Sequence, residues 1–360
     1  MGIHQCPSEK DHWSEDCCYS NNWIKNRISY RKWKAIHLAL SYDSDWLEIQ
    51  LKNSFRKYWQ PYEHVTVDEG MIPFKGRFRY RQHVRGKPKA TGIKYYALCD
   101  EKGYTWWFWT YQGIQPSTSL LVSKFTSMLP HVGYKVYVDS YYGSYGLARK
   151  LSKQGHRFTL ACQANRPAWL FSGYLMQGLK RGEWKSIYNP SKDMTALSFY
   201  DNGKCNFISN IFSGEGIITT SKGKIIPKIV SDYRQSYGFV DRSDSFHLKY
   251  LFPHRRRKRT MAQFLSYLKM SVVNAWILYQ SRTGEKLRQK DFLRRLIDQI
   301  SPETPDHHPN RDLHLIVRGD KRTSCSYCWA KYQKASSTVY QCMTCKNYLH
   351  PDCFFDFHNQ

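Results

Sequence analysis

The stretch YKVYVDSYYGSYGLARKLSKQGHRFTLACQ, residues 134–163, changes its hydrophobic period twice. Apolar residues alternate through VYV, as in a strand, and SYGLARKLSKQG then places them at the spacing of an amphipathic helix. Gly155 closes this helix, and HRFTLACQ returns to the β-prone composition of a second strand. A strand, a helix and a strand in succession predict a mixed α/β core.

The segments on either side extend this pattern. Upstream, strands are expected in HVTVDEG, IKYYALCD and TWWFWTYQG, with a helix before them at about residues 46–58 and one after them near residues 117–129. Downstream, residues 166–229 are short β-prone pieces between polar turns. Helical spacing returns over about residues 233–280 and near residues 285–300.

These changes of texture predict six parts of the chain. They are an N-terminal helical region for dimerisation or DNA binding, two parts of the α/β core, a β-rich insertion between them, a Pro-rich linker and a cysteine-rich module. The helical region is expected over residues 1–60, and the two parts of the core over residues 61–165 and 231–300. The insertion is expected over residues 166–230, the linker over residues 301–312 and the cysteine-rich module over residues 313–360.

Basic residues dominate the charge: 55 Lys and Arg stand against 29 Asp and Glu, a formal net charge of +26. This surplus predicts a polyanionic partner, because each neutralised phosphate releases condensed counterions. Nucleic acid is the first candidate and an anionic membrane surface the second. Apolar runs stay well below the roughly 20 residues that span a bilayer, and no apolar signal-peptide core follows Met1. We therefore expect neither a membrane protein nor a secreted one.

Two segments concentrate the positive charge. Residues 75–94, KGRFRYRQHVRGKPKATGIK, hold eight Lys or Arg and no acid, and a strand would place Arg77, Arg79 and Arg81 on one face. That face fits the DNA backbone, or else a solvated edge strand protected by its charge. The run HRRRKR, residues 254–259, fits phosphate contact, nuclear import or both. The DNA-binding candidates are Lys75, Arg77, Arg79, Arg81, Arg85, Lys87, Lys89, Arg255, Arg256, Arg257, Lys258 and Arg259.

Carboxylates recur at the ends of β-branched runs. Asp68 follows VTV and Asp139 follows VYV, so in each strand the valines can line one face while the Asp points to the other. Asp241 and Asp244 lie at i and i+3 and share one side if their segment is helical. Converging carboxylates need cations, and Mg²⁺ takes one or two of them together with phosphate oxygens. The structural alternative for each Asp is an ordinary turn or cap residue.

Two aromatic features have both a structural and a functional interpretation. Trp106, Trp107 and Trp109 could stack on an unpaired base, but within a strand they fit the core better. His247 follows Asp244 on the expected helix, where a structural His and a phosphate-facing His fit equally well. It therefore stays outside the expected catalytic set.

The carboxy-terminal cysteines have the spacing of a zinc module. CSYC at residues 325–328 and CMTC at residues 342–345 are two CxxC knuckles, and thiolates with imidazoles suit tetrahedral Zn²⁺. A two-ion cross-brace would pair the first knuckle with His350 and Cys353, and the second with His358 and, unless it is an ordinary surface residue, His314. The expected ligands are Cys325, Cys328, Cys342, Cys345, His350, Cys353, His358 and His314. Such spacing fits modules that bind DNA and modules that bind proteins or histone tails.

The ordered set VTVDEG, GKPKATGIKYYALCD, VYVDSYYGS, FYDNGK, KIVSDYRQSYGFVDRSD and VVNAWILY resembles the transposase domain of the piggyBac family over roughly residues 28–280. The resemblance implies an RNase H-like α/β core interrupted by a β-rich insertion, and a cysteine-rich zinc domain that recognises transposon-end DNA. By motif, Asp68, Asp139 and Asp241 correspond to the first, second and third catalytic Asp, and Asp244 to a helper ligand. Glu69 follows the first Asp in the family pattern without being a principal ligand.

The resemblance also implies cofactors and partners. Two catalytic Mg²⁺ ions, for which Mn²⁺ can substitute, are expected beside two structural Zn²⁺ ions. Double-stranded DNA is the expected substrate, at transposon ends and a TTAA target, bound by a homodimer in the nucleus, with no membrane and no small-molecule substrate. The alternative is a domesticated, non-catalytic DNA- or chromatin-binding protein. Intact acids favour the enzyme, whereas an amino-terminal end shorter than usual for the family favours the alternative.

Overall fold

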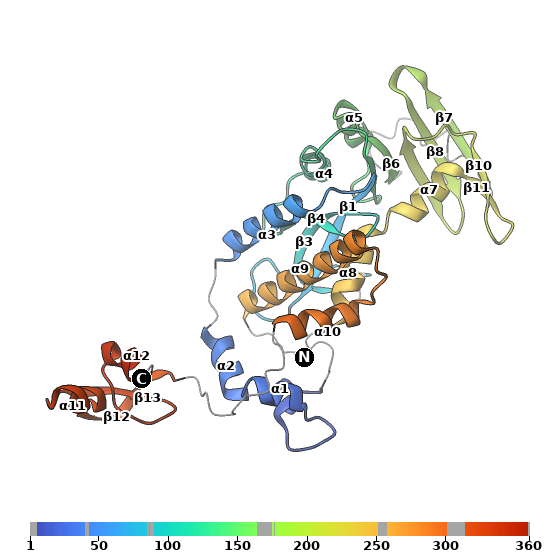
Figure 1. Cartoon of the computed structure of the whole chain (residues 1–360). Coiled ribbons are helices and arrows are strands. Elements are labelled where there is room, and N and C mark those ends of the chain that lie inside the picture. The colour runs from blue at the N-terminus through green and yellow to red at the C-terminus, as the bar shows by residue number, and fades with distance from the viewer. Residues whose placement is uncertain are drawn as a thin grey trace. The chain divides into compact units, whose positions relative to one another are not determined.

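The computed structural model describes residues 6–39, 43–84, 86, 90–163, 175, 177–250, 258–300 and 314–358. The chain forms two compact units, of which the larger contains residues 1–9 and 40–300 and the smaller residues 10–39 and 301–360 (Figure 1). The larger unit carries the sheet and the candidate carboxylates, and the smaller carries the cysteine module.

A nine-stranded mixed sheet forms the larger unit's centre, in the order β2-β3-β1-β5-β6-β9-β8-β7, with β4 paired to β3 beside this path. β5 runs parallel to β1 and to β6, and the other pairings between described strands of the sheet are antiparallel. The expected mixed α/β core is confirmed. The strands are β1 (His64–Pro73), β2 (Gln82–His83), β3 (Thr91–Asp100), β4 (Thr105–Thr110), β5 (Lys135–Val138), β6 (Arg157–Cys162), β7 (Trp184–Asn189), β8 (Met194–Tyr200) and β9 (Lys204–Ser209).

The β-rich segment after β6 extends this sheet. β9 pairs antiparallel with β6, with Thr159 opposite Ser209, and β8 and β7 continue outward from it. A separate two-stranded ladder follows, formed by β10 (Ile217–Thr219) and β11 (Ile225–Pro227). The boundaries expected for the insertion stay predictions.

Helices cover the sheet and connect its strands. Leu121 of α4 and Leu147 of α5 share one hydrophobic cluster with Val136 and Val138 of β5. The helical stretch expected over residues 233–280 is divided, because a break at Gly238 separates α7 from α8. Within the described residues, the helices of this unit are α3 (Ser44–Tyr58), α4 (Thr118–Thr126), α5 (Tyr145–Lys153), α7 (Lys228–Ser236), α8 (Phe239–Lys249), α9 (Arg259–Thr283) and α10 (Gln289–Ile300), with a 3-10 turn at Pro190–Lys192.

The smaller unit is built around a very small core. Its buried cluster consists of Cys325, Tyr327, Cys342 and Leu349. A core of this size needs a further source of stability such as bound metal. Its elements are a 3-10 helix at Glu9–Trp13, α1 (Asn22–Arg27), α2 (Tyr30–Ala39), β12 (Ile316–Ser324), α11 (Ser326–Tyr332), β13 (Ser337–Cys342) and α12 (Pro351–His358).

Candidate functional site

Asp68 and Asp139 occupy matching positions on the parallel neighbours β1 and β5. Thr66 and Tyr137 are the last paired residues of this ladder, and each Asp follows its paired residue at i+2. Both carboxylates therefore come at the same level of the sheet. The valines of the two strands are buried in the core, as alternation predicts: Val65, Val67, Val136 and Val138.

Tyr233 of α7 lies near both of these carboxylates. Burial is the main reason why its pKa rises above the usual value, and the negative charges of Asp139 and Asp68 raise the pKa further. The Thr66 hydroxyl donates to the carbonyl oxygen of Ser236 at 2.7 Å, which fixes the end of α7 against β1. The two strands and α7 thus surround one polar site.

Asp139 also begins a tight turn. Its Oδ1 accepts a hydrogen bond from the Tyr141 N–H at 2.9 Å, and its carbonyl oxygen accepts one from the Gly143 N–H at 3.0 Å. A Cβ on Gly143 would lie 1.7 Å from the carbonyl oxygen of Ala161 on β6, so a side chain does not fit there. Asp139 is therefore a turn residue as well as a candidate ligand, and the turn uses one of its two carboxylate oxygens.

Glu69 holds this turn against β1, which sequence reasoning missed. The hydroxyl of the fully buried Tyr142 donates to Glu69 Oε2 at 2.6 Å. Burial first, and then Glu69 and Asp68, raise the pKa of Tyr142, so its phenol stays a donor. The Glu69 backbone N–H donates to Asp68 Oδ1 at 2.8 Å. The second tyrosine of the YYGS motif was the signal that could have pointed to this contact.

Asp241 and Asp244 lie on α8, which packs on β1 and β3. The Ser243 and Thr105 hydroxyl groups are hydrogen-bonded at 2.9 Å, which anchors the first turns of α8 to β4. Asp241 is exposed and Asp244 half-buried. The i and i+3 spacing predicted from the sequence is thus realised on a helix that packs on β1, the strand of Asp68.

The four acids come from three elements and do not form one tight cluster. Among the described residues, three groups of side chains have ligand atoms that all lie within 4.8 Å of one another: two Cys/His sets and an exposed group formed by residues 16–18. Asp68, Asp139 and Asp241 do not form such a group. Their donor atoms are carboxylate oxygens, which suit Mg²⁺ and Mn²⁺, and a two-ion site divides its ligands between two centres.

His247 has a structural environment. Its Nδ1 lies 4.0 Å from Asp244 Oδ1. Burial first, and the charge of Lys269 second, lower the pKa of His247 to about 3. It is therefore neutral near pH 7 and cannot attract phosphate as a cation.

The expected strand across Arg77, Arg79 and Arg81 is wrong. Residues 74–81 are irregular, with a bend at Gly76 and a turn at residues 79–80, and β2 pairs with β3 only from Gln82. The Arg81 guanidinium donates to the carbonyl oxygens of Lys75 and Gly76 at 3.0 and 3.1 Å, which bends the segment back on itself. The three arginines are nevertheless all exposed.

The two basic segments meet in the folded chain. The Arg259 guanidinium at the start of α9 lies 5.1 Å from the centre of the Phe78 ring, a cation–π contact. We call the described cations of these segments the basic surface: Lys75, Arg77, Arg79, Arg81, Lys258 and Arg259. The other DNA-binding candidates lie outside the described residues: Arg85, Lys87, Lys89, Arg255, Arg256 and Arg257.

The tryptophans of β4 belong to the core and its margin. Trp106 is 1% exposed, and its indole N–H donates to the carbonyl oxygen of Trp59 at 3.1 Å. Trp109 is half-buried and stacks on Tyr96, and Trp107 packs against the same core. These contacts support the interpretation of the tryptophans as core residues.

The cysteines and histidines of the smaller unit come together in two sets of four. Cys325, Cys328, His350 and Cys353 form one set, and His314, Cys342, Cys345 and His358 form the other. This is the pairing expected for a cross-brace, with His314 included. The donor set of each group fits tetrahedral Zn²⁺.

One thiol in each set is easily deprotonated. Burial alone would raise the pKa of Cys325, but hydrogen bonds from the backbone N–H groups of Cys328, His350 and Tyr327, together with one from the Cys328 side chain, outweigh it and lower the pKa to about 7. In the second set, burial raises the pKa of Cys345, but hydrogen bonds with His358, Asn347 and Cys342 together outweigh it and lower the pKa to about 6. Thiolates are the form that binds metal, so both sets are suited to it.

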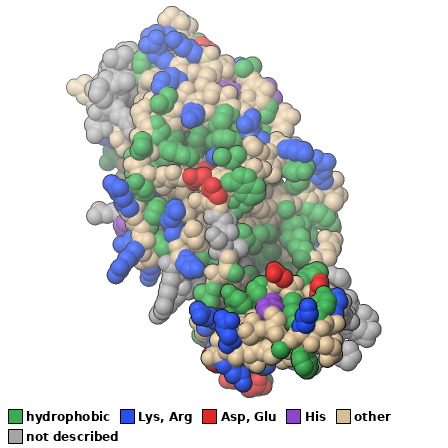
Figure 2. Space-filling model, turned by 90° about the vertical axis from the view of Figure 1, so that its left-hand side faces the viewer, with side chains coloured by type: hydrophobic (Ala, Val, Ile, Leu, Met, Phe, Trp, Pro, Cys, Tyr) green, Lys and Arg blue, Asp and Glu red, His purple; other side chains and the backbone are tan. Residues whose placement is uncertain are grey.

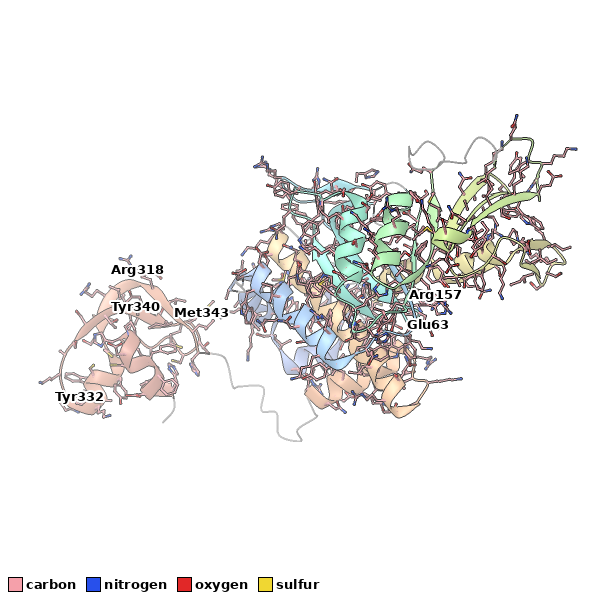
Figure 3. The ribbon with its side chains drawn as sticks, turned by 90° about the horizontal axis from the view of Figure 1, so that it is seen from above. Glu63, Arg157, Arg318, Tyr332, Tyr340 and Met343 are labelled. Carbon is pink, nitrogen blue, oxygen red and sulfur yellow. The ribbon has the colours of Figure 1, made fainter. Side chains whose placement is uncertain are left out.

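The surface of the zinc module carries aromatic and basic side chains. Arg318 of β12 lies opposite Tyr340 of β13 (Figure 3). Further exposed aromatic side chains are Trp329, Tyr332 and Phe355. Cations beside aromatic rings suit a nucleic acid, but they also suit a protein partner.

Figure 2 shows Lys and Arg side chains spread over one face of the molecule, with few acidic side chains between them. In the part of the chain that the structure describes, no helix is both long and apolar enough to cross a bilayer.

Three comparisons relate the chain to known proteins. The sequence profile of the family Transposase IS4 matches residues 1–276. The human PiggyBac transposable element-derived protein 3 and the human chimeric ERCC6-PGBD3 protein are each 26% identical over 339 residues, covering 82% of this chain. The match spans 55% of the first relative and 31% of the second, so the chain covers about half or less of these proteins.

The fold has a counterpart among solved structures. A piggyBac transposase, solved by cryo-electron microscopy as a synaptic complex with hairpin DNA, superposes with a TM-score of 0.68 at 19% identity. The match covers 98% of this chain and 84% of the other, which establishes a shared fold. Because the family profile spans most of the chain, and its relatives and fold are of the piggyBac type, the chain belongs to the piggyBac-type transposases of the Transposase IS4 family.

Proposed function

We propose that this chain is a piggyBac-type DNA transposase that cleaves and joins DNA strands with two Mg²⁺ ions. Asp68, Asp139 and Asp241 are the principal ligands in this proposal, and Asp244 is a helper ligand. The observation that carries it is the register of β1 and β5, which places Asp68 and Asp139 at one level of the sheet. When bound, the ions would activate the attacking oxygen and stabilise the leaving oxygen of the phosphodiester.

The chain's own residues supply position and charge. Tyr142 and Glu69 hold the turn that carries Asp139 against β1, and α8 presents Asp241. The basic surface would hold the phosphate backbone on the larger unit, because its cations come from two converging segments and all but the half-buried Arg259 are exposed.

The remaining features of the proposal follow the family. The zinc module would bind transposon-end DNA through two structural Zn²⁺ ions, and the chain would act as a homodimer in the nucleus on TTAA targets. The expected domain boundaries, including residues 1–60 as a helical region and 313–360 as the zinc domain, belong to the same proposal.

The test compares the parent with an Asp139→Asn variant in nicking of supercoiled plasmid and in cleavage of labelled duplex ends of the element. Asn keeps the oxygen that accepts from the Tyr141 N–H but removes the negative charge, so the turn persists while ligation weakens. Asp193→Asn is the matched control, because Asp193 lies in a left-handed turn conformation that Asn tolerates. Nicking by the parent and the control but not by Asp139→Asn is expected. Equal DNA binding without cleavage by any of them would refute catalysis.

The second candidate is a non-cleaving DNA- or chromatin-binding protein. The observation that favours it is that neither the basic surface nor the two Cys/His sets include any of the four acids, so DNA binding through them would not need catalytic residues. In that case the parent and Asp139→Asn would bind DNA with the same affinity, and neither would cleave it.

A further inference from the structure

Gly70 and Tyr95 face each other across the ladder between β1 and β3. A Cβ on Gly70 would lie 2.2 Å from Cζ of Tyr95, so the phenol ring occupies the space over the glycine. Gly70 shares a face of β1 with Asp68, because residues i and i+2 of a strand point the same way. Glycine at residue 70 therefore lets the Tyr95 ring cross β1 on the face that carries the first acid.

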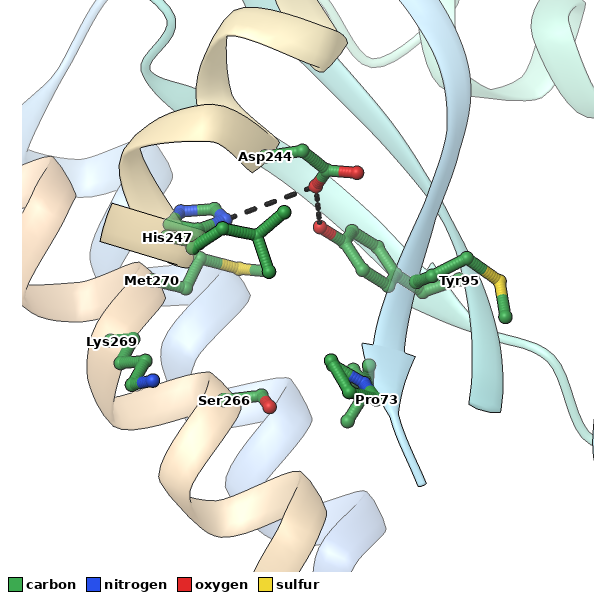
Figure 4. A pocket seen from close by; sticks show the side chains of 10 residues that line it. Pro73, Tyr95, Asp244, His247, Ser266, Lys269 and Met270 are labelled. Carbon is green, nitrogen blue, oxygen red and sulfur yellow. Dashed lines mark hydrogen bonds and ion pairs between the residues drawn. The ribbon is translucent and has the colours of Figure 1, made fainter. Parts of the chain in front are cut away.

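The Tyr95 hydroxyl reaches an acid of α8. It donates to Asp244 Oδ1 at 2.5 Å (Figure 4). Tyr95 is 4% exposed, and the contact borders a small pocket between β1, α8 and α9, lined also by His247, Ser266 and Met270. In Figure 4 the other oxygen of Asp244 points away from the phenol. One carboxylate oxygen is thus fixed, which sets the direction of the other.

The bond between the Tyr95 hydroxyl and Asp244 is short, and its donor side chain is buried. A hydrogen bond to a carboxylate is about twice as strong as one between neutral groups. His247 does not replace it, because its Nδ1 is 4.0 Å from the same oxygen, beyond hydrogen-bond distance.

Docking of α8 does not depend on this bond. Ser243 is hydrogen-bonded to Thr105 at 2.9 Å, and the carbonyl oxygen of Phe246 accepts from the Gln289 side chain at 3.1 Å. The helix therefore has independent anchors on both sides of Asp244. The Tyr95 hydroxyl acts on the direction of one carboxylate.

We infer that Tyr95 is a positioning residue for the acids of α8, and that Gly70 is required because it admits the Tyr95 ring. By fixing the rotamer of Asp244, Tyr95 presents the second carboxylate oxygen beside Asp241, one helical turn earlier. Partners that orient a metal ligand typically change metal affinity or activity by about 10–100-fold. The inference rests on the proposed function, because it takes Asp241 and Asp244 as metal ligands.

The first test is a Tyr95→Phe variant of the full, zinc-loaded chain without DNA. Mn²⁺ is titrated in, and the free ion is followed by electron paramagnetic resonance. We expect an affinity about 10–100-fold weaker than that of the parent, with an unchanged urea midpoint, because the ring stays and only the hydroxyl is lost. In plasmid nicking, the variant should need more Mg²⁺ and recover at saturating metal.

The second test uses Gly70→Ala with Gly203→Ala as its control, since a Cβ on Gly203 meets nothing within 4 Å. Gly70→Ala should weaken Mn²⁺ binding, whereas Gly203→Ala should not. In a Tyr95→Ala background, Gly70→Ala should add no further loss, because the clash is gone. Equal Mn²⁺ affinity of the parent and Tyr95→Phe would overturn this inference alone. A parent that binds no Mn²⁺ beyond its zinc sites and nicks no DNA would overturn both it and the proposed function.

Discussion

The role of an acidic side chain in this protein depends on the residues to which it is hydrogen-bonded. Asp139 starts a turn and is also a candidate ligand, and Glu69 is a tether although it follows the first acid directly. The sequence predicted that Asp68 and Asp139 follow β-branched runs, because this pattern is local. The expectation that each run ends its strand holds for Asp139 but is wrong for Asp68, because β1 continues its pairing with β3 as far as Pro73. It could not predict that Tyr142 would reach Glu69, because residues 73 positions apart meet only in the folded chain.

At the residue scale, His247 should make stability depend on pH. Its pKa is about 3 in the folded chain against 6.5 for an ordinary His, so below pH 6.5 the unfolded chain binds a proton that the folded chain does not. The free energy of unfolding therefore falls as pH drops from about 6.5 towards 3, with a slope approaching about 1.4 kcal/mol per pH unit from this residue.

The measurement is urea denaturation of the parent and His247→Asn at pH 7.5 and 5.5. The variant lacks the titrating group, so its free energy of unfolding should fall less between the two pH values. Parallel losses in the two proteins would show that His247 titrates normally in the folded chain.

At the scale of the element, the strand–turn–helix after β5 depends on a close approach between backbones. The spacing of apolar residues determines the helix α5 and the strands around it, so the sequence of residues 134–163 was sufficient to predict them. The segment over residues 77–81 has the same alternation in sequence and forms no strand. Alternation correctly predicts that these arginines are exposed, but a strand also needs a neighbouring strand to pair with. In this segment, the described residues that pair with β3 begin at Gln82.

Gly143→Ala should destabilise the larger unit. The new Cβ would lie 1.7 Å from the Ala161 carbonyl oxygen, and backbone must move, which typically costs about 1–3 kcal/mol or more. Gly146→Ala is the matched control: the nearest atom to its new Cβ would be Ser144 Oγ at 4.0 Å, and Ala in a helix gains about 0.5–1 kcal/mol over Gly. Chemical denaturation measures both, and equal effects of the two substitutions would contradict the close approach.

The basic surface is a second prediction at this scale. Arg79 is exposed, so Arg79→Ala should weaken binding to duplex DNA of any sequence and lower the slope of log affinity against log salt by about 1. Lys222→Ala, an exposed cation between β10 and β11, is the control and should leave the slope unchanged. Fluorescence anisotropy at several salt concentrations measures it, and identical slopes for parent and Arg79→Ala would remove Arg79 from the interface.

For the whole molecule, the division into two units predicts independent responses to metal removal. Among the described residues, the cysteine module has a small buried cluster formed by Cys325, Tyr327, Cys342 and Leu349, so bound Zn²⁺ should supply its folding energy, whereas the larger unit has an extensive core of its own. A chelator should expose the module's chain to protease and leave the larger unit resistant.

Metal analysis gives the matching count. The parent should contain two Zn²⁺ per chain, Cys342→Ser fewer, and Cys205→Ser the same as the parent, because Cys205 lies outside both sets. Loss of zinc from Cys205→Ser, or unfolding of the larger unit by chelation, would contradict this division.

The sequence by itself determined the α/β class, the acids that follow β-branched runs, the zinc knuckles and the basic character, because each rests on short-range periodicity, spacing or composition. Only the tertiary structure decided that β9 of the insertion extends the central sheet, that Arg259 meets Phe78, and that the Tyr95 ring crosses Gly70 to reach Asp244. These contacts join residues far apart in the chain, and strand pairing and side-chain packing create them only when the whole core forms.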